Sequence, residues 1–277
     1  MSIPSVLQRI LDTKRAEVEA GRRTRPLSEL KARIADLPAT RGFADRLART
    51  GAEDPPAVIA EFKRASPSAG WIAEHADPGR VAQAYEAAGA ACLSVLTDAQ
   101  YFRGAIADLQ AARDACTLPV LRKDFVIDAW QVFETRAIGA DAMLLIVAAL
   151  DDARLAEFSA IGEAVGLDVL VEVHDEAELE RALKVPGRLL GINNRDLHRF
   201  RTRLETSERL APRVPPERIA IAESGIHSAA DLQRLQQAGI GAFLIGESLM
   251  RDAEPGAALA SLRGRAPDHE LQGVPTT

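Results

Sequence analysis

Eight short apolar segments recur along the chain, and segments with helical periodicity lie between them. Each apolar segment has four or five residues, is rich in Val, Ile, Leu and Ala, and starts 20 to 34 residues after the previous one. Because polar residues do not alternate regularly within them, these segments are typical of parallel strands buried on both faces. The predicted strands are residues 58–62, 92–96, 120–123, 142–146, 169–173, 189–192, 219–222 and 242–245.

The intervening segments predict helices. Apolar residues return at helical spacing at Val81, Ala84, Tyr85 and Ala88, for example. Glycines that can end a helix follow such segments at positions 89, 139, 166 and 239. Eight strand-helix repeats fit either a closed barrel or an open, doubly wound sheet. The count of eight favours the (β/α)8 barrel, or TIM barrel, and no glycine-rich dinucleotide fingerprint follows the first strand.

The chain extends beyond the expected barrel at both ends. We expect the barrel to span residues 56–265, as part of a single domain over residues 1–277, because α/β barrels use this length as one domain. Residues 1–50 are amphipathic and arginine-rich, and we interpret them as an N-terminal helical extension. This extension is either a solvated cap under the barrel or a lid that reaches the active-site rim. The polar tail, residues 267–277, lacks periodicity and is expected to be disordered.

Composition narrows the class of partner. The formal net charge of -6 argues against a broad surface for nucleic acid or for an anionic membrane. The N-terminal region contains neither a signal-peptide core nor a bilayer-spanning segment, so we expect a cytoplasmic protein. Cys92 and Cys116 lack C-x-x-C spacing and are expected to be buried free thiols. We expect a monomer that holds no metal and binds neither nucleic acid nor membrane.

Charged and polar side chains lie at the carboxyl ends of the predicted strands. In a (β/α)8 barrel the active site lies at the carboxyl ends of the strands, so these residues are expected to converge on one mouth. Two lysines among three carboxylates would be costly to bury unless they pair, and such clusters are typical of sites with shifted pKa values. The residues are Glu61 and Lys63, which lie two positions apart and so share one side of a strand, and Lys123, Glu172, Asn193, Arg195, Glu223 and Ser224.

The last two predicted strands lead into glycine-bearing turns, Ser224-Gly225 and Gly246-Glu247-Ser248. Glycine permits close backbone approach, and amides at helix N-termini bind anions. The turns therefore predict a phosphate cradle of the kind that barrels carry after strands 7 and 8, and hence a small anionic substrate. Because a carboxylate is unfavourable beside a phosphate, we expect Glu247 to contribute only its backbone N–H.

Six segments resemble the signature segments of indole-3-glycerol phosphate synthases. They are KRASPSAG, SVLTDAQYFRG, RKDFVID, GINNRDL, AESGI and GESLM. The resemblance runs from the N-terminal ILDTKRAEVE segment to about Met250, in the expected order and at the expected strands. It implies a cofactor-free step of tryptophan biosynthesis, the conversion of 1-(2-carboxyphenylamino)-1-deoxyribulose 5-phosphate to indole-3-glycerol phosphate with loss of CO2 and water.

The resemblance also implies roles for the charged residues. Lys123 matches the general acid at the substrate ketone, and Glu172 matches the general base. Lys63 matches a lysine that contacts the substrate and acts as acid in the later step, although the assignment of each lysine to a step stays open. Glu61 would keep Lys63 and Lys123 charged and oriented.

The remaining matches are binding positions. Arg195 lies where the family binds the anthranilate carboxylate, because a guanidinium pairs well with a planar anion. His174, which follows Glu172, is expected to face outward or into a loop, and we assign it a structural role. The other matches are Asn193, Glu223 and Ser224 for the substrate hydroxyls and developing charge; Pro67, Phe102, Phe125, Leu144 and Leu197 for an apolar pocket around the aromatic ring; and Lys63, Ser66, Gly225, Gly246, Glu247 and Ser248 for the phosphate.

Two other functions are compatible with the residues alone. A strand-end lysine, either Lys123 or Lys63, can form a Schiff base, which would make the chain a class I sugar-phosphate aldolase. The chain could also bind a phosphorylated ligand without catalysis.

Residues 64–72 are rich in Ser, Pro and Gly and are expected to form a mobile lid.

Overall fold

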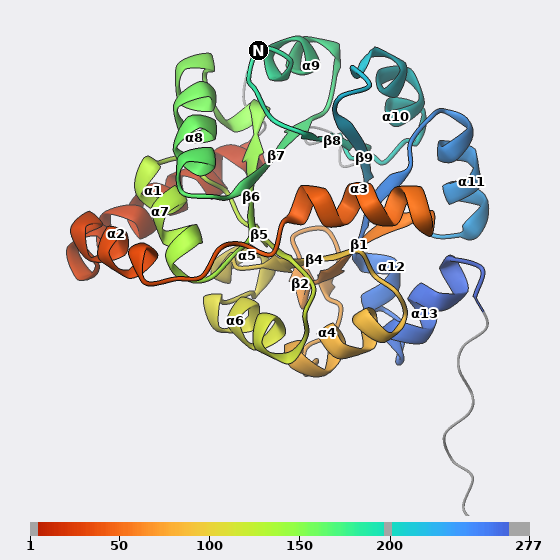
Figure 1. Ribbon diagram of the computed structural model, residues 1–277, viewed down its shortest axis with the longest axis horizontal. Coiled ribbons are helices and arrows are strands. Elements are labelled where there is room, and N and C mark those ends of the chain that lie inside the picture. Colours follow the sequence, from red (N-terminus) through yellow and green to blue (C-terminus); the bar gives the residue numbers. More distant parts are fainter. Residues whose placement is uncertain (1–4, 197–200, 266–277) are drawn as a thin grey trace, which may run out of the picture.

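Eight parallel strands close into a barrel (Figure 1). The computed structural model describes residues 5–196 and 201–265. The strands are β1 (Ala57–Phe62), β4 (Cys92–Leu96), β5 (Val120–Lys123), β6 (Ala142–Ile146), β7 (Asp168–Val173), β8 (Leu189–Asn193), β9 (Ile219–Glu223) and β10 (Ala242–Ile245). They pair in the order β1-β10-β9-β8-β7-β6-β5-β4, and β4 pairs with β1 to complete the ring. The predicted TIM barrel is confirmed, and the open sheet is excluded.

Helices cover the outside of the barrel. Several begin at a side chain that accepts a hydrogen bond from the first turn, such as Asp128 before α7 (Ala129–Ala137) and Ser228 before α11 (Ala229–Gln237). The glycines expected to end helices all have positive φ, which glycine adopts without strain. The other helices are α4 (Pro78–Ala87), α5 (Ala99–Phe102), α6 (Ile106–Ala115), α8 (Asp152–Ala164), α9 (Glu176–Ala182), α10 (Glu205–Leu210), α12 (Glu247–Met250) and α13 (Pro255–Leu262), with 3-10 turns at Val147–Ala149 and Ala211–Arg213 and a hairpin of β2 (Ala65–Ser66) and β3 (Gly70–Trp71).

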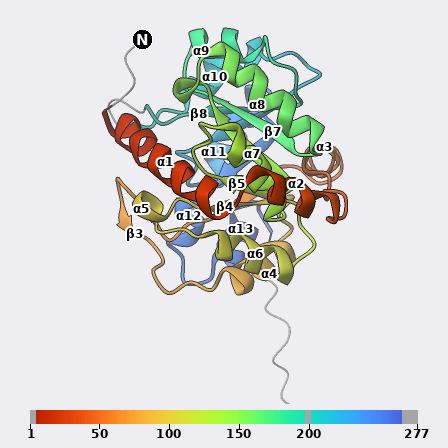
Figure 2. The ribbon, with the colours of Figure 1, turned by 90° about the vertical axis from the view of Figure 1, so that its left-hand side faces the viewer.

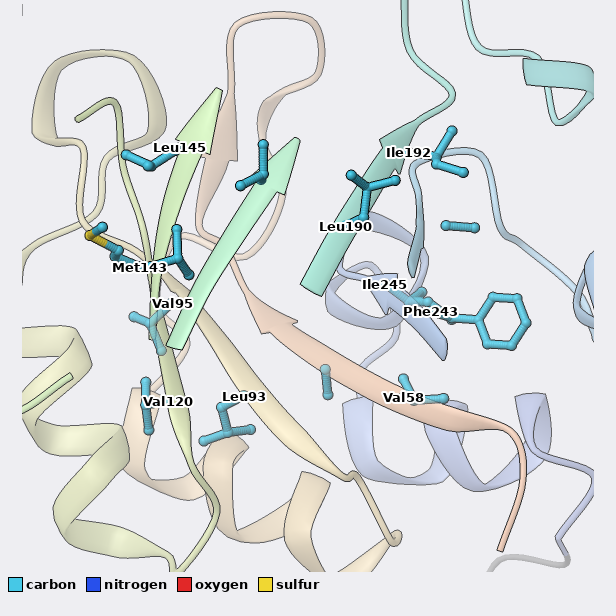
Figure 3. Packing of buried hydrophobic residues seen from close by; sticks show 14 of the residues in the cluster. Val58, Leu93, Val95, Val120, Met143, Leu145, Leu190, Ile192, Phe243 and Ile245 are labelled. Carbon is cyan, nitrogen blue, oxygen red and sulfur yellow. The ribbon is translucent and has the colours of Figure 1, made fainter. Parts of the chain in front are cut away.

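Alternate residues of each strand face opposite sides of the barrel wall. Val171 of β7 packs outward in the cluster beneath the helices, whereas Leu170 packs inside the barrel. Figure 3 shows part of the outward set, including Leu93 and Val95 of β4. Because Glu172 lies two positions after Leu170, the same alternation turns it into the barrel.

The interior of the barrel is filled in layers. One buried apolar layer comes from β1, β5, β7 and β9, which alternate around the ring, and consists of Ile59, Leu121, Leu170 and Ile221. Four side chains from alternate strands form the usual layer of such a barrel. The next inward positions of the same strands, two residues further along, are Glu61, Lys123, Glu172 and Glu223. A charged layer therefore follows an apolar one toward the carboxyl ends of the strands.

Three helices precede β1, and two of them lie at opposite ends of the barrel. α3 (Phe43–Glu53) closes the amino end, where Phe43 and Leu47 are buried with the interior residues of the strands. α1 (Ser5–Thr24) lies on the other side of the barrel from α3, as Figure 2 shows, and lines the cavity at the carboxyl ends. α2 (Leu27–Ala35) packs on α7. The extension thus supplies both a helix under the barrel and a helix at its rim.

Three expectations from composition concern the chain outside the site. No helix within residues 5–196 and 201–265 is both long and apolar enough to cross a membrane. Cys92 and Cys116 are buried and unpaired, as predicted. The tail expected to be disordered, residues 267–277, lies outside the described residues.

The closure of the barrel by α3 leads to a stability test. Leu47 is 1% exposed, so Leu47→Ala leaves a cavity and is expected to lower the free energy of unfolding by about 2–5 kcal/mol. Leu27, at the start of α2, is 40% exposed, and Leu27→Ala is expected to change that free energy by less than about 0.5 kcal/mol. Urea denaturation followed by circular dichroism measures both. Equal losses would show that α3 does not close the barrel.

Candidate active site

A cavity of about 320 Å³ opens at the carboxyl ends of the strands. This volume is typical of a small-molecule site. Every predicted site residue within the described ranges lines it; Leu197 alone lies outside them. The predicted residues at the cavity are Glu61, Lys63, Ser66, Pro67, Phe102, Lys123, Phe125, Leu144, Glu172, Asn193, Arg195, Glu223, Ser224, Gly225, Gly246, Glu247 and Ser248.

Lys123, at the end of β5, is held between two carboxylates. Its Nζ lies 2.6 Å from Oε2 of Glu223 and 3.2 Å from Oε2 of Glu172. Burial alone would lower the pKa of Lys123, but these carboxylates and the charge of Glu61 outweigh burial and raise the pKa well above its usual value. Lys123 is therefore an ammonium throughout the physiological pH range.

Glu172 and Glu223 are both buried, and both face the Lys123 ammonium. Burial raises the pKa of Glu223, and repulsion from Glu172 adds to this, so the net shift is upward although Lys123 opposes it. Burial also disfavours the charge on Glu172, but Lys123 and His174 outweigh it and lower the pKa of Glu172. One carboxylate is thus kept ionised while its neighbour binds a proton more readily. Such a separation of pKa values is what acid-base catalysis requires.

Small residues on the intervening strands make room for the charged layer. Ser94 of β4 donates a hydrogen bond to Oε2 of Glu61 at 3.1 Å. Gly191 of β8 faces Glu223, and a Cβ at this glycine would lie 2.1 Å from Oε1 of Glu223. The sequence interpretation did not single out either residue. In the sequence, these two positions could have been recognised as small residues at inward-facing positions of a strand.

The first strand contributes a second ion pair. Nζ of Lys63 lies 2.9 Å from Oε1 of Glu61, as the shared strand face predicts. This contact agrees with the expectation that Glu61 holds Lys63, whereas the described ion pairs of Lys123 are with Glu172 and Glu223. The direct partners of Lys123 come instead from β9, opposite β5 in the ring, and from β7, two strands away. The negative charge of Glu61 nevertheless helps to raise the pKa of Lys123.

The two glycine-bearing turns are neighbours because β9 and β10 pair along their length. Ser224 and Gly225 have φ values of 66° and 79°, so consecutive residues take the left-handed conformation that glycine favours. At Gly246 the backbone passes close to β1, and a Cβ there would lie 2.6 Å from Oε1 of Glu61. Both turns line the cavity, where the predicted phosphate cradle requires them.

Side chains of the last turn are already engaged. Oε1 of Glu247 lies 2.8 Å from Nη2 of Arg251, and its Oε2 lies 3.5 Å from Nη2 of Arg195. The Ser248 hydroxyl donates a hydrogen bond to the carbonyl of Ile226 at 3.0 Å. With its proton used in this way, the hydroxyl is not a donor to a phosphate. Backbone N–H groups are the donors that this turn can offer.

Arg195 lies at the mouth of the cavity, between two loops. Its Nη1 donates a hydrogen bond to Oγ of Ser68 at 2.8 Å, and its backbone N–H donates to Oδ1 of Asn193 at 3.0 Å. Nε of Arg195 makes no hydrogen bond to any described residue. This nitrogen is buried, so the guanidinium meets the cavity through its terminal nitrogens.

An apolar wall completes the cavity. The rings of Phe102 and Phe125 have centroids 6.0 Å apart and are tilted by 38°. Leu7 and Ile10 of α1 also line the cavity, which the sequence interpretation did not predict. Their spacing of three residues was the available signal, because it marks the apolar face of an amphipathic helix.

Lys14 ties α1 to this wall. Its Nζ lies 2.9 Å from both Oδ2 of Asp98 and Oδ1 of Asp124, and its side chain is 3% exposed. Asp98 accepts a hydrogen bond from the backbone N–H of Phe102 at 3.1 Å, and Asp124 accepts one from that of Phe125 at 2.8 Å. One buried ammonium thus connects α1 to the backbone of both aromatic residues.

His174 lies in the turn between β7 and α9, which agrees with the expectation that it faces into a loop, but its ring also contacts the charged layer. Positions 172 and 174 lie on the same side of an extended chain. Nε2 of His174 lies 3.4 Å from Oε1 of Glu172, and Nδ1 lies 2.9 Å from Oε2 of Glu178. Counting two positions from Glu172 was the signal that the sequence interpretation missed.

The acidic residues of the site are matched by ammonium, guanidinium and imidazole groups. Within the described part of the chain, no group of three or more His, Cys, Asp or Glu residues is arranged to hold a metal ion.

The Lys14 contacts lead to a second test. Lys14→Met keeps the length of the side chain but leaves Asp98 buried without a cation and Asp124 with Arg122 as its remaining cation, so the free energy of unfolding is expected to fall by about 3–5 kcal/mol. The exposed Lys31 lies over the Phe133 ring, and Lys31→Met is expected to cost less than about 1 kcal/mol. Urea denaturation of both variants measures the difference. Unchanged stability of Lys14→Met would contradict a buried ion pair.

Two solved structures share the barrel. The chain is similar to tryptophan synthase subunit alpha from Legionella pneumophila str. Paris, with a TM-score of 0.58 and 13% identity over 82% of this chain and 98% of that one. It is also similar to a 3-hexulose-6-phosphate synthase, with a TM-score of 0.57 and 15% identity over 76% of this chain and 100% of that one. At these identities the likeness shows the fold alone.

Sequence relatives are much closer. An indole-3-glycerol phosphate synthase from Acidithiobacillus ferrooxidans is 55% identical over 257 residues, which are 93% of this chain and 98% of the relative. One from Laribacter hongkongensis is 53% identical over 258 residues, with the same coverage of both chains. The family model described as indole-3-glycerol phosphate synthase matches residues 7–262, which include the whole barrel and every predicted site residue. The chain therefore belongs to the indole-3-glycerol phosphate synthase family.

Proposed function

We propose that this chain converts 1-(2-carboxyphenylamino)-1-deoxyribulose 5-phosphate to indole-3-glycerol phosphate, CO2 and water. The observation that carries the proposal is the Lys123 ammonium, buried between Glu172 and Glu223 at the barrel mouth. Around it lie two glycine-bearing turns for a phosphate, an aromatic wall for the arylamine and an arginine for its carboxylate. The parts of the substrate and the parts of the cavity therefore correspond.

Ring closure needs an acid at the ketone. The ring carbon that bears the carboxylate attacks the C2 ketone carbon, a carbon-carbon bond forms, and the carbonyl electron pair moves to oxygen. That oxygen takes a proton from Lys123, whose charge also stabilises the developing alkoxide in a site shielded from water. Glu223, whose carboxylate is 2.6 Å from Nζ and binds protons more readily than usual, is the group that returns the proton.

Two eliminations follow ring closure. The carboxylate leaves as CO2, and its bonding electrons restore the aromatic ring. Glu172 then removes a proton from C1, and the C2 hydroxyl leaves as water with a proton from Lys63, which Glu61 holds as an ammonium 2.9 Å away. One proton is taken up overall, because the substrate carboxylate departs as a neutral molecule.

Substrate binding uses the two ends of the cavity. We assign the phosphate to backbone N–H groups of the turns at Gly225 and Gly246, with Ser66 and Lys63 beside them. Arg195 takes the anthranilate carboxylate, because its guanidinium lies at the mouth of the cavity and pairs well with a planar anion. Asn193 and Ser224 position the substrate hydroxyls.

The same geometry disfavours Schiff-base chemistry. An imine forms only from a neutral amine, and catalytic Schiff-base lysines are normally found with a lowered pKa. Lys123 has the opposite environment, because the adjacent carboxylates raise its pKa. An aldolase mechanism through Lys123 is therefore not supported.

We further propose that the N-terminal helices and the barrel fold as one unit that acts as a monomer in the cytoplasm. α1 and α3 share buried surface with the barrel. Only Leu27 and Trp71 are large, exposed apolar residues in the described part of the chain, which leaves little surface for a stable self-interface. Two buried free thiols fit a reducing compartment.

Lys123→Ala tests the proposed acid. The variant is expected to lower kcat by at least about 10²–10⁴-fold, the usual contribution of a positioned general acid, while it still binds product. Indole fluorescence measures turnover, and calorimetry with indole-3-glycerol phosphate measures binding. Lys184→Ala, at an exposed lysine outside the cavity, is the matched control and should retain full activity. Turnover by Lys123→Ala at the wild-type rate would remove the proposed mechanism.

Gly246→Ala tests the phosphate cradle. The added methyl group would meet Glu61 at 2.6 Å and shift the turn, which typically costs about 1–3 kcal/mol. The inhibition constant for inorganic phosphate is therefore expected to rise by about tenfold, the equivalent of 1.4 kcal/mol. Gly241→Ala has open space for a Cβ and should leave this constant unchanged. The cradle is misplaced if both variants bind inorganic phosphate as the wild type does.

A further inference from the structure

His174 lies between two carboxylates directly beyond β7. Its Nε2 is 3.4 Å from Oε1 of Glu172, and its Nδ1 is 2.9 Å from Oε2 of Glu178 in the first turn of α9. Oε2 of Glu178 also accepts a hydrogen bond from the backbone N–H of His174 at 2.8 Å. The imidazole side chain is 10% exposed. Its ring is therefore fixed in orientation, with one nitrogen on α9 and the other toward the active site.

The two oxygens of Glu172 consequently face different cations. Oε2 faces Lys123 of β5, and Oε1 faces His174. Glu223 of β9 also faces Glu172. Without the imidazole, Glu172 and Glu223 would share one ammonium. The histidine supplies the second positive charge of this group, and Glu178 balances that charge from behind.

We propose that His174 is a positioning residue for the reaction, an imidazolium anchored by Glu178 that keeps Glu172 ionised and holds its Oε2 toward Lys123 and the substrate. The inference rests on the proposed function, in which Glu172 is the general base. A base must be deprotonated and correctly aimed before it can take a proton. His174 meets both needs without touching the substrate, since it contacts the oxygen of Glu172 that does not face Lys123.

The titration of His174 agrees with this geometry. Burial alone would lower its pKa, but contacts with Glu172 and Glu178 outweigh burial and raise the pKa of His174 to about 10. The imidazolium is therefore present throughout the neutral range and is lost only as the pH rises through the shifted value. At the pH where Glu172 would take up a proton, His174 is charged.

His174→Gln removes the charge but keeps a hydrogen-bond donor of similar reach. An opposite charge within about 4–6 Å lowers the pKa of a carboxyl by 1–3 units, so its loss is expected to move the acid limb of the kcat/KM profile up by about one pH unit. Activity should be lowest at low pH and recover as the pH rises, with KM nearly unchanged. His174→Asn is a second variant with the same expected shift, in case the first does not fold.

Glu178→Gln is the matched comparison. It keeps an acceptor for the backbone N–H of His174 and leaves Glu172 to hold the imidazolium at low pH. Its acid limb should therefore coincide with that of the wild type. The ionisations of the substrate are the same for all the enzymes, so differences between profiles report the protein.

The outcomes separate the inference from the function on which it rests. An upward shift for the His174 variants, but not for Glu178→Gln, supports the proposal. Coincident profiles for all enzymes, or equal shifts for both positions, would show that the histidine serves only to hold the loop, and would overturn it. Absence of indole fluorescence from the wild type at every pH would instead reject the proposed function. Circular dichroism and inhibition by inorganic phosphate establish that each variant is folded and retains its cavity.

Discussion

A buried ammonium between two buried carboxylates is the interaction on which the site depends. Burial costs each of these ions several kcal/mol of hydration, which only a nearby opposite charge offsets, so Lys123, Glu172 and Glu223 fit a folded barrel only as a set. Their meeting follows from barrel geometry, because β5, β7 and β9 alternate around the ring and direct one inward position of each strand into the same layer. The apolar layer beneath excludes water from one side. The electrostatic interactions among these groups are therefore strong, because the fold shields the groups from water.

Three consecutive charged residues at the end of β5 and just beyond it contact different parts of the molecule. Arg122 pairs with Glu134 of α7 at 2.9 Å on the outside of the barrel, and also with Asp124 at 3.2 Å. Lys123 points into the barrel, and Asp124 points to Lys14 of α1. Three consecutive charged residues thus join the covering helix, the active site and the N-terminal helix. Because the three residues are consecutive, their networks of contacts are adjacent, although no ion pair links Lys123 to Lys14.

Much of this arrangement could be predicted from the sequence, for a definite physical reason. Parallel strands have continuous apolar patterns and side-chain period two, so the polar residues at their ends are restricted to one mouth, and Lys123 and Glu172 could be placed there. The contacts of Lys14 could not, because Asp98 and Asp124 are distant in sequence and no periodicity relates them to α1. His174 was accessible to the same period-two rule and was missed. Leu197 and the tail stay predictions, because the structure does not describe them.

The N-terminal helices link stability and chemistry at opposite ends of the barrel. α3 adds Phe43 and Leu47 to the apolar interior, so its contribution is hydrophobic and independent of the reaction. α1 instead covers the mouth, where its apolar face shields charged groups and raises the strength of their interactions. Its anchor, Lys14, ends on the carboxylate of Asp124, the residue directly after Lys123. The first helix of the chain is therefore joined directly to the residue that follows the active-site ammonium, although it belongs to no strand of the barrel.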